Sequence, residues 1–160
     1  MMYLTLMDGY DLVLYTVVDI WSPENAEGYQ RKIDLRHAKD FANFLRRNFY
    51  SPAAIILSLR PEYKDKVKYK DGYLFFEPDV KFYIIDGQHR VAGLKYLYSN
   101  DNPVNELTLE LKFPVVIIPV KNRFEEAEQF VILNKKRKRI RTDLAERFIA
   151  RAYKYAADTG

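Results

Sequence analysis

The stretch that decides the fold is FYIIDGQHRVAGLKYL, residues 82–97. It begins as a short apolar run typical of a buried strand. After Asp86-Gly87 it continues with apolar residues at helical spacing. Glycine tolerates the backbone conformations that a sharp change of direction requires. The sequence therefore predicts a strand, a turn at residues 86–90 and a helix, with three polar residues, Gln88, His89 and Arg90, where the helix begins.

The predicted turn has the properties of an anion site. The first N–H groups of a helix have no intrahelical partner, and the positive end of the helix dipole lies beside them. Gly87 would let a ligand approach the backbone, Arg90 could bind it through two parallel hydrogen bonds, and Gln88 and His89 would add donors. Asp86 is expected to be an N-cap, a Mg²⁺ ligand or, only if the protein is an enzyme, a catalytic general base. The alternative is a purely structural turn.

Composition limits the class of protein. The chain has 160 residues, 48% of them hydrophobic, which suits one domain with a substantial core. It has no cysteine, so disulfides, thiol catalysis and thiolate metal sites are excluded, and its two histidines lack metal-binding spacing. We expect no metal site. There is neither a membrane-length apolar run nor a signal-peptide pattern, so we expect a soluble, cytoplasmic protein that makes no membrane contact.

The remaining patterns predict an α+β fold. The first ten residues show no clear period, and an Asp-Gly pair at residues 71–72 suggests a hairpin turn. The sequence ends in a predicted helix rather than in a completed fold, which suggests that the chain is a fragment of a longer protein. The expected strands are 11–20, 53–60, 81–85 and 113–120, and the expected helices begin near Asp34, Gln88, Arg123 and Thr142.

Positive charge is concentrated in one segment. Six of the seven residues in KKRKRIR, 135–141, are basic, and the rest of the chain is net acidic. Local positive charge is typical of nucleic-acid binding, although a solvated loop is the alternative. We interpret the segment as a contact to DNA phosphates, made by Lys135, Lys136, Arg137, Lys138, Arg139 and Arg141.

Four segments resemble a known family. IDGQHR is similar to the signature of DGQHR-domain proteins, which include DndB of bacterial DNA phosphorothioation (sulfur modification) systems, and to the phosphate-binding turn of the ParB/sulfiredoxin superfamily. GYQR (28–31), FPVVIIPV (113–120) and EQFVILNKKRKRI (128–140) resemble further family segments in the expected order. The resemblance implies one ParB/sulfiredoxin-like domain over residues 1–160, with a mixed β-sheet flanked by helices. Two departures matter: ParB has a glutamate-arginine-arginine turn, and the sulfiredoxin cysteine is absent, which excludes sulfiredoxin chemistry.

The resemblance also implies a function and a site. The first hypothesis is a DNA-binding regulator of a bacterial DNA-modification or defence locus, with no required cofactor. The second is an NTPase or phosphotransferase that binds a nucleotide with Mg²⁺ at the same turn, and the third is a scaffold. The oligomeric state is left open, a homo-oligomer included. The implied phosphate- or nucleotide-binding residues are Gly87, Gln88, His89 and Arg90, with Gln30, Arg31 and Asn134 nearby.

Overall fold

A mixed five-stranded sheet forms the centre of the molecule. The computed structural model describes residues 1–48, 50–51, 53–100, 110–136 and 143–159. In spatial order the strands are β1 (Tyr3–Asp8), β7 (Lys112–Pro119), β3 (Ile55–Leu59), β6 (Phe82–Asp86) and β2 (Thr16–Val17). The pairs β1–β7 and β3–β6 are antiparallel, whereas β7–β3 and β6–β2 are parallel. The expected α+β architecture with a mixed sheet is confirmed.

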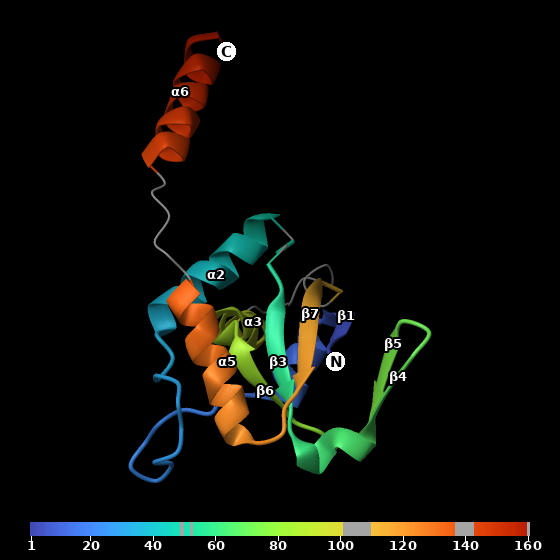
Figure 1. The fold of residues 1–160 in the computed structure, drawn as a ribbon. Helices are drawn as coiled ribbons and strands as arrows, with labels where there is room; N and C mark the ends of the chain where they lie inside the picture. The colour runs from blue at the N-terminus through green and yellow to red at the C-terminus, as the bar shows by residue number, and fades with distance from the viewer. Residues whose placement is uncertain (49, 52, 101–109, 137–142, 160) are drawn as a thin grey trace.

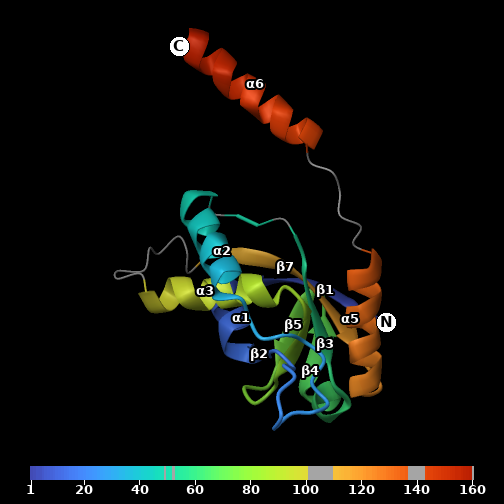
Figure 2. The ribbon, with the colours of Figure 1, turned by 90° about the vertical axis from the view of Figure 1, so that its left-hand side faces the viewer.

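Helices cover both faces of this sheet. Figure 2 shows α1 (Gly9–Tyr15), α2 (Leu35–Asn48) and α3 (Gln88–Asn100) on one side and α5 (Arg123–Lys136) on the other. The core lies between the sheet and the first group of helices, because inward-facing strand residues meet buried helix residues there. Its fully buried side chains include Leu12, Leu45, Ile55, Leu57, Phe82, Ile84, Leu94, Leu97, Phe113 and Ile117.

Two parts of the chain lie outside this arrangement. A short 3₁₀ helix, η1 (Pro61–Lys66), leads into a two-stranded hairpin of β4 (Val67–Lys70) and β5 (Tyr73–Phe76). The predicted turn is confirmed, since Asp71 and Gly72 both have positive φ angles, 55° and 81°. The last helix, α6 (Asp143–Thr159), stands away from the sheet and its helices, with none of its residues buried (Figure 1).

The N-terminal prediction was wrong. Residues 11–20 were expected to form one strand, but α1 occupies residues 9–15 and only Thr16–Val17 pair with β6. A short apolar run suits a buried helix as well as a strand. Here Leu12 is fully buried in the core shared with α3. A strand that was not expected, β1, forms from Tyr3–Asp8, which showed no clear period, and pairs with β7 at the other edge of the sheet. Among the described helices, none is both long and apolar enough to cross a lipid bilayer.

Candidate functional site

The turn between β6 and α3 has the predicted geometry. Gly87 has φ 111°, a conformation that other residues rarely adopt, and its carbonyl accepts the helical hydrogen bond from Val91 N at 3.0 Å. A Cβ at Gly87 would lie 3.2 Å from both Ile55 Cγ1 and Arg90 Nη2. The backbone N–H groups of Gln88 and His89 belong to the first turn of α3, so they have no intrahelical acceptor. Gly87 is therefore required just before these donors, because a side chain at this position would be both strained and crowded.

The turn forms one wall of a large cavity, which we call the turn pocket. Its volume is about 850 Å³, within the range of small-molecule sites. Three segments that are distant in sequence converge on it: the loop before α2, the turn itself and the C-terminal half of α5. It is lined by Tyr29, Gln30, Arg31, Lys32, Asp34, His37, Ile85, Asp86, Gly87, Gln88, His89, Arg90, Phe130 and Asn134.

Arg31 and Lys32 supply positive charge at the turn pocket. Both side chains are exposed, and neither forms an ion pair with any residue that the structure describes. Asn134 also lines the turn pocket, and its Nδ2 donates to the Phe130 carbonyl at 2.7 Å. Lys135 follows it, exposed, at the end of α5. The side chain of Lys136 and residues 137–141 of the predicted DNA-binding segment lie outside the described part of the chain.

Arg90 differs from the sequence-based expectation. Its Nη1 donates to the Ala53 carbonyl at 2.7 Å, and its Nη2 donates to the Ala54 carbonyl at 3.0 Å and lies 3.5 Å from Asp86 Oδ2. The guanidinium thus joins the turn to the segment before β3, rather than presenting two parallel donors to the cavity. Asp86 forms an ion pair with Arg90, a contact that is not among the three roles expected for it from the sequence. Within the described residues, no three His, Asp or Glu side chains are grouped to hold a metal ion.

His89 and Gln30 also make internal contacts. His89 Nε2 accepts a hydrogen bond from the backbone N–H of Asp34 at 3.1 Å, and Asp34 Oδ1 caps α2 by accepting from Arg36 N at 2.9 Å. Burial lowers the pKa of His89 and nearby His37 lowers it further, against the opposing effect of Asp34. Neutral His89 is therefore favoured as an acceptor. Gln30 is 2% exposed, and its Nε2 donates to the carbonyl of Ile84 in β6.

Gln88 lies between the turn pocket and a second cavity, which we call the side pocket. The side pocket has a volume of about 320 Å³. It is lined mainly by apolar residues: Val13, Thr16, Val17, Val18, Ile20, Ile33, Ile84, Gln88, Val91, Ala92 and Lys95. Within the described part of the chain, Gln88 Oε1 is the one buried side-chain polar atom without a hydrogen-bond partner. A buried acceptor normally has a donor, so this atom is available to a ligand N–H.

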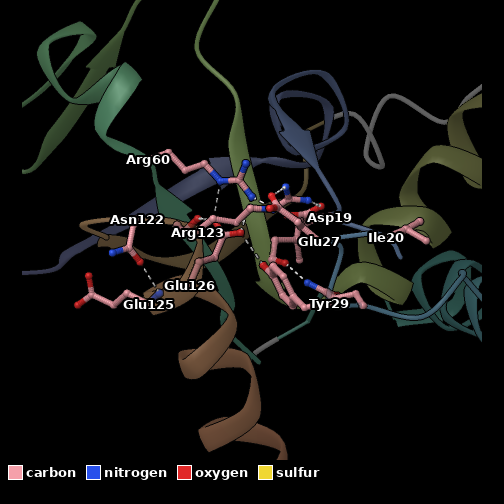
Figure 3. A network of polar contacts seen from close by, with 12 residues as sticks. Asp19, Ile20, Glu27, Tyr29, Arg60, Asn122, Arg123, Glu125 and Glu126 are labelled. Atoms are coloured by element: carbon pink, nitrogen blue, oxygen red, sulfur yellow. Dashed lines mark hydrogen bonds and ion pairs between the residues drawn. The ribbon is translucent and has the colours of Figure 1, made fainter. Parts of the chain in front are cut away.

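A buried ion network of Asp19, Arg60, Arg123 and Glu126 fixes the loop that leads to the turn pocket (Figure 3). Asp19 is 4% exposed and Glu126 is fully buried. Arg60 Nη2 bonds Asp19 at 2.8 Å and Glu126 at 2.7 Å, while Arg123 bonds Asp19 at 2.5 Å. Burial raises the pKa of Asp19, but hydrogen bonds from Arg123, Asn25 and Arg60 more than offset this, and the net pKa is lowered. Asp19 therefore remains ionised.

The same network supports the wall of the turn pocket through Tyr29. The Tyr29 hydroxyl donates to Glu126 Oε2 at 2.8 Å, and its ring packs against that of Phe130 at 5.3 Å between centroids. The hydroxyl of Ser58 in β3 donates to Glu126 Oε1. Local sequence patterns did not predict this network. No local pattern joins Asp19, on a loop, to residues of β3 and α5.

The fold and site define a mixed α/β domain with a partly cationic pocket at a strand–turn–helix junction. Residues 1–154 match the DndB family, described as DNA-sulfur modification-associated, and the chain belongs to this family. No curated protein matches the chain in sequence. Among solved structures, it is similar to the C-terminally truncated chromosome-partitioning protein ParB from Caulobacter crescentus complexed with CTP-gamma-S, with 14% identity and a TM-score of 0.47. That match covers 86% of this chain and 55% of the ParB chain.

Proposed function

We propose that this DndB-family chain binds the phosphate backbone of DNA at the turn pocket and regulates a DNA-modification locus. The observation that carries the proposal is the convergence on one cavity of the Gln88 and His89 amides, which have no intrahelical acceptor, and the side chains of Arg31 and Lys32. Amides at a helix N-terminus and nearby cations together favour a phosphate group. Because Arg90 is bonded to carbonyls, its role here is to hold the turn.

The basic segment extends the same surface in this proposal. Asn134 lines the turn pocket, and Lys135 follows it at the end of α5, so the run 135–141 begins at the rim. Base-edge contacts are not required, since phosphate contacts supply affinity and position without reading sequence. The proposed mechanism is therefore charge neutralisation along the backbone, with one phosphate held at the turn.

Replacing Arg31 and Lys32 together by alanine is expected to weaken DNA binding and to reduce its salt dependence. Each lost phosphate contact lowers the slope of log affinity against log salt by about 0.9, so the double variant should lose about 1.8. Fluorescence-anisotropy titrations of a DNA duplex at several salt concentrations measure this slope. The matched control replaces Lys64 and Lys68 together by alanine. This variant removes the same amount of charge, but near the β4–β5 hairpin and away from the turn pocket. Equal slopes for the two double variants would refute the proposal.

A nucleotide is a second candidate ligand, favoured by the size and neighbours of the turn pocket. A cavity of about 850 Å³ exceeds what one phosphate fills, and the apolar side pocket adjoins it at Gln88. A base with an exocyclic amine could donate to Gln88 Oε1 while the phosphates contact the turn. In this hypothesis Asp86 would hold Mg²⁺ or act as a general base.

Calorimetry with each of the four ribonucleoside triphosphates in Mg²⁺ tests this second candidate. Binding is expected to release measurable heat for a nucleotide that carries an exocyclic amine, and Gln88→Leu should abolish it by removing the acceptor. A phosphate-release assay that compares the wild type with Asp86→Asn then separates binding from hydrolysis. If no triphosphate gives heat or turnover, the nucleotide hypothesis is rejected and DNA remains the ligand to test.

A further inference from the structure

The last helix has an apolar face that no described residue of its own chain covers. Every residue of α6 is at least partly exposed, and large apolar side chains on one stripe are markedly so: Leu144 74%, Phe148 72%, Ile149 52% and Tyr155 72%. A 17-residue helix in water depends mostly on packing of its amphipathic face for stability. Figures 1 and 2 both show α6 separated from the rest of the domain. The stability of α6 therefore depends on a partner for this face.

A second exposed apolar stripe lies on the outer side of α5. Phe124 is 72% exposed, and Val131 and Ile132 are each 43% exposed. With Ala127 and Glu128 they line a shallow hollow of about 380 Å³. The inner side of the same helix is occupied, because Glu126 is buried against β3 and Arg60. The outer stripe has no such partner among the described residues, and the hollow is large enough for an aromatic side chain.

The two stripes match in spacing when the helices run in opposite directions. Phe124 and Val131 are seven residues apart, as are Phe148 and Tyr155. An antiparallel alignment that places Phe124 opposite Tyr155 places Val131 opposite Phe148. It also places Ala127 opposite Ala152, where two small residues let the helix axes approach. The pairing thus follows from the spacing of the apolar residues along each helix.

The charged residues of the two helices also favour the antiparallel alignment. In this alignment Glu128 lies opposite Arg151, and Glu125 lies opposite Lys154. A parallel alignment would instead place the acidic first turns of both helices together, since α5 begins with Glu125 and Glu126 and α6 begins with Asp143 and Glu146. Like charges in contact disfavour the parallel arrangement, and opposite charges favour the antiparallel one.

We propose that the occupant of the α5 stripe is α6 of a second copy of this chain, so that two copies exchange their last helices. The exchange is reciprocal: each copy supplies one α5 and one α6, and a two-fold axis relates the two identical contacts. The structure favours the second copy over the chain's own α5, because α6 is not packed on that helix. Exchange buries four exposed stripes in one dimer. The proposal is independent of the function assigned to the turn pocket.

Sedimentation equilibrium of the 160-residue chain tests this proposal. The wild type is expected to be a dimer of 19.0 kDa subunits. Phe148→Asp and Phe124→Asp should each raise the dimer dissociation constant at least about 100-fold, because each buried aromatic is lost twice in a two-fold interface. The matched control is Ala150→Asp, which places the same residue on the opposite side of α6 and should leave the dimer intact. A monomeric wild type would overturn the proposal, including the case in which α6 folds onto its own α5.

A charge exchange tests the direction and the partner helix. Glu128→Arg should weaken the dimer, and the double variant Glu128→Arg/Arg151→Glu should restore it, because each pair then has opposite charges again. Thermal unfolding of each variant checks that the domain itself remains folded. Failure of the second substitution to restore dimerisation would overturn the α5–α6 pairing, as would a dimer that survives Phe124→Asp. The readout here is the dimer dissociation constant alone, whereas DNA or nucleotide affinity tests the turn pocket, so the two proposals fail separately.

Discussion

Replacement of Glu126 by alanine is expected to lower the free energy of unfolding by about 3–5 kcal/mol, because it removes one of the two carboxylates that compensate the largely buried Arg60 cation. Glu126 is fully buried and accepts hydrogen bonds from Ser58, Arg60 and Tyr29. Without the carboxylate, the Arg60 guanidinium would keep only Asp19 among the network's acids, and two hydroxyl donors would lose their acceptor. Urea denaturation followed by circular dichroism measures the change.

Glu128→Ala is the matched control for this experiment. Glu128 lies on the same helix, has an exposed side chain and forms no ion pair among the described residues. We expect its removal to change stability by no more than about 0.5 kcal/mol. The Glu126→Ala and Glu128→Ala variants should be measured at a concentration where both have the same oligomeric state, since Glu128 belongs to the proposed exchange surface. Similar midpoints for the two variants would show that the buried network contributes little to the fold.

Gly87→Ala is expected to destabilise the protein and to remove ligand binding at the turn pocket. The positive φ angle of 111° costs a residue with a side chain about 1–3 kcal/mol. In addition, the new Cβ would lie 3.2 Å from Ile55 Cγ1 and Arg90 Nη2, so the turn would have to shift. That shift would move the amides of Gln88 and His89. Thermal unfolding and DNA titration measure the two effects.

Gly72→Ala separates backbone strain from the site. Gly72 also has a positive φ angle, 81°, but a Cβ there would meet nothing within 4 Å, and the residue lies in the β4–β5 hairpin. The control should therefore share the strain of Gly87→Ala without its steric contacts, and it should keep wild-type affinity. If both glycine variants bind DNA equally well, the turn does not hold the ligand.

Local sequence patterns predicted the elements that depend on neighbouring residues. Glycine and aspartate at residues 71–72 and 86–87 predicted two chain reversals, and both have the required positive φ angles at Gly72 and Gly87. The helix that was expected to begin near Asp34 is present as α2, and the Asp34 carboxylate caps it. These features are local, because backbone conformation and capping are decided within a few residues.

The tertiary structure decided which contacts each side chain makes at the turn pocket. The sequence indicated that Arg90 would lie in a turn, but only the packing of that turn against residues 53–54 shows that its donors are used by carbonyls. Likewise, the apolar run 11–20 is compatible with a strand or a helix, and its contact with α3 made residues 9–15 helical. The β-branched and aromatic composition of this run favoured a strand, but burial in the tertiary structure overrode that local preference.

What the sequence by itself determined, then, is the strand–turn–helix unit, the mixed α+β architecture and the place of positive charge. What only the tertiary structure decided is the buried ion network of Asp19, Arg60, Arg123 and Glu126, and the convergence of three segments on the turn pocket. The physical reason is the distance along the chain over which each kind of interaction acts. Local patterns determine backbone geometry over a few residues, whereas a buried charge finds its partner across the chain only when the sheet and helices have packed.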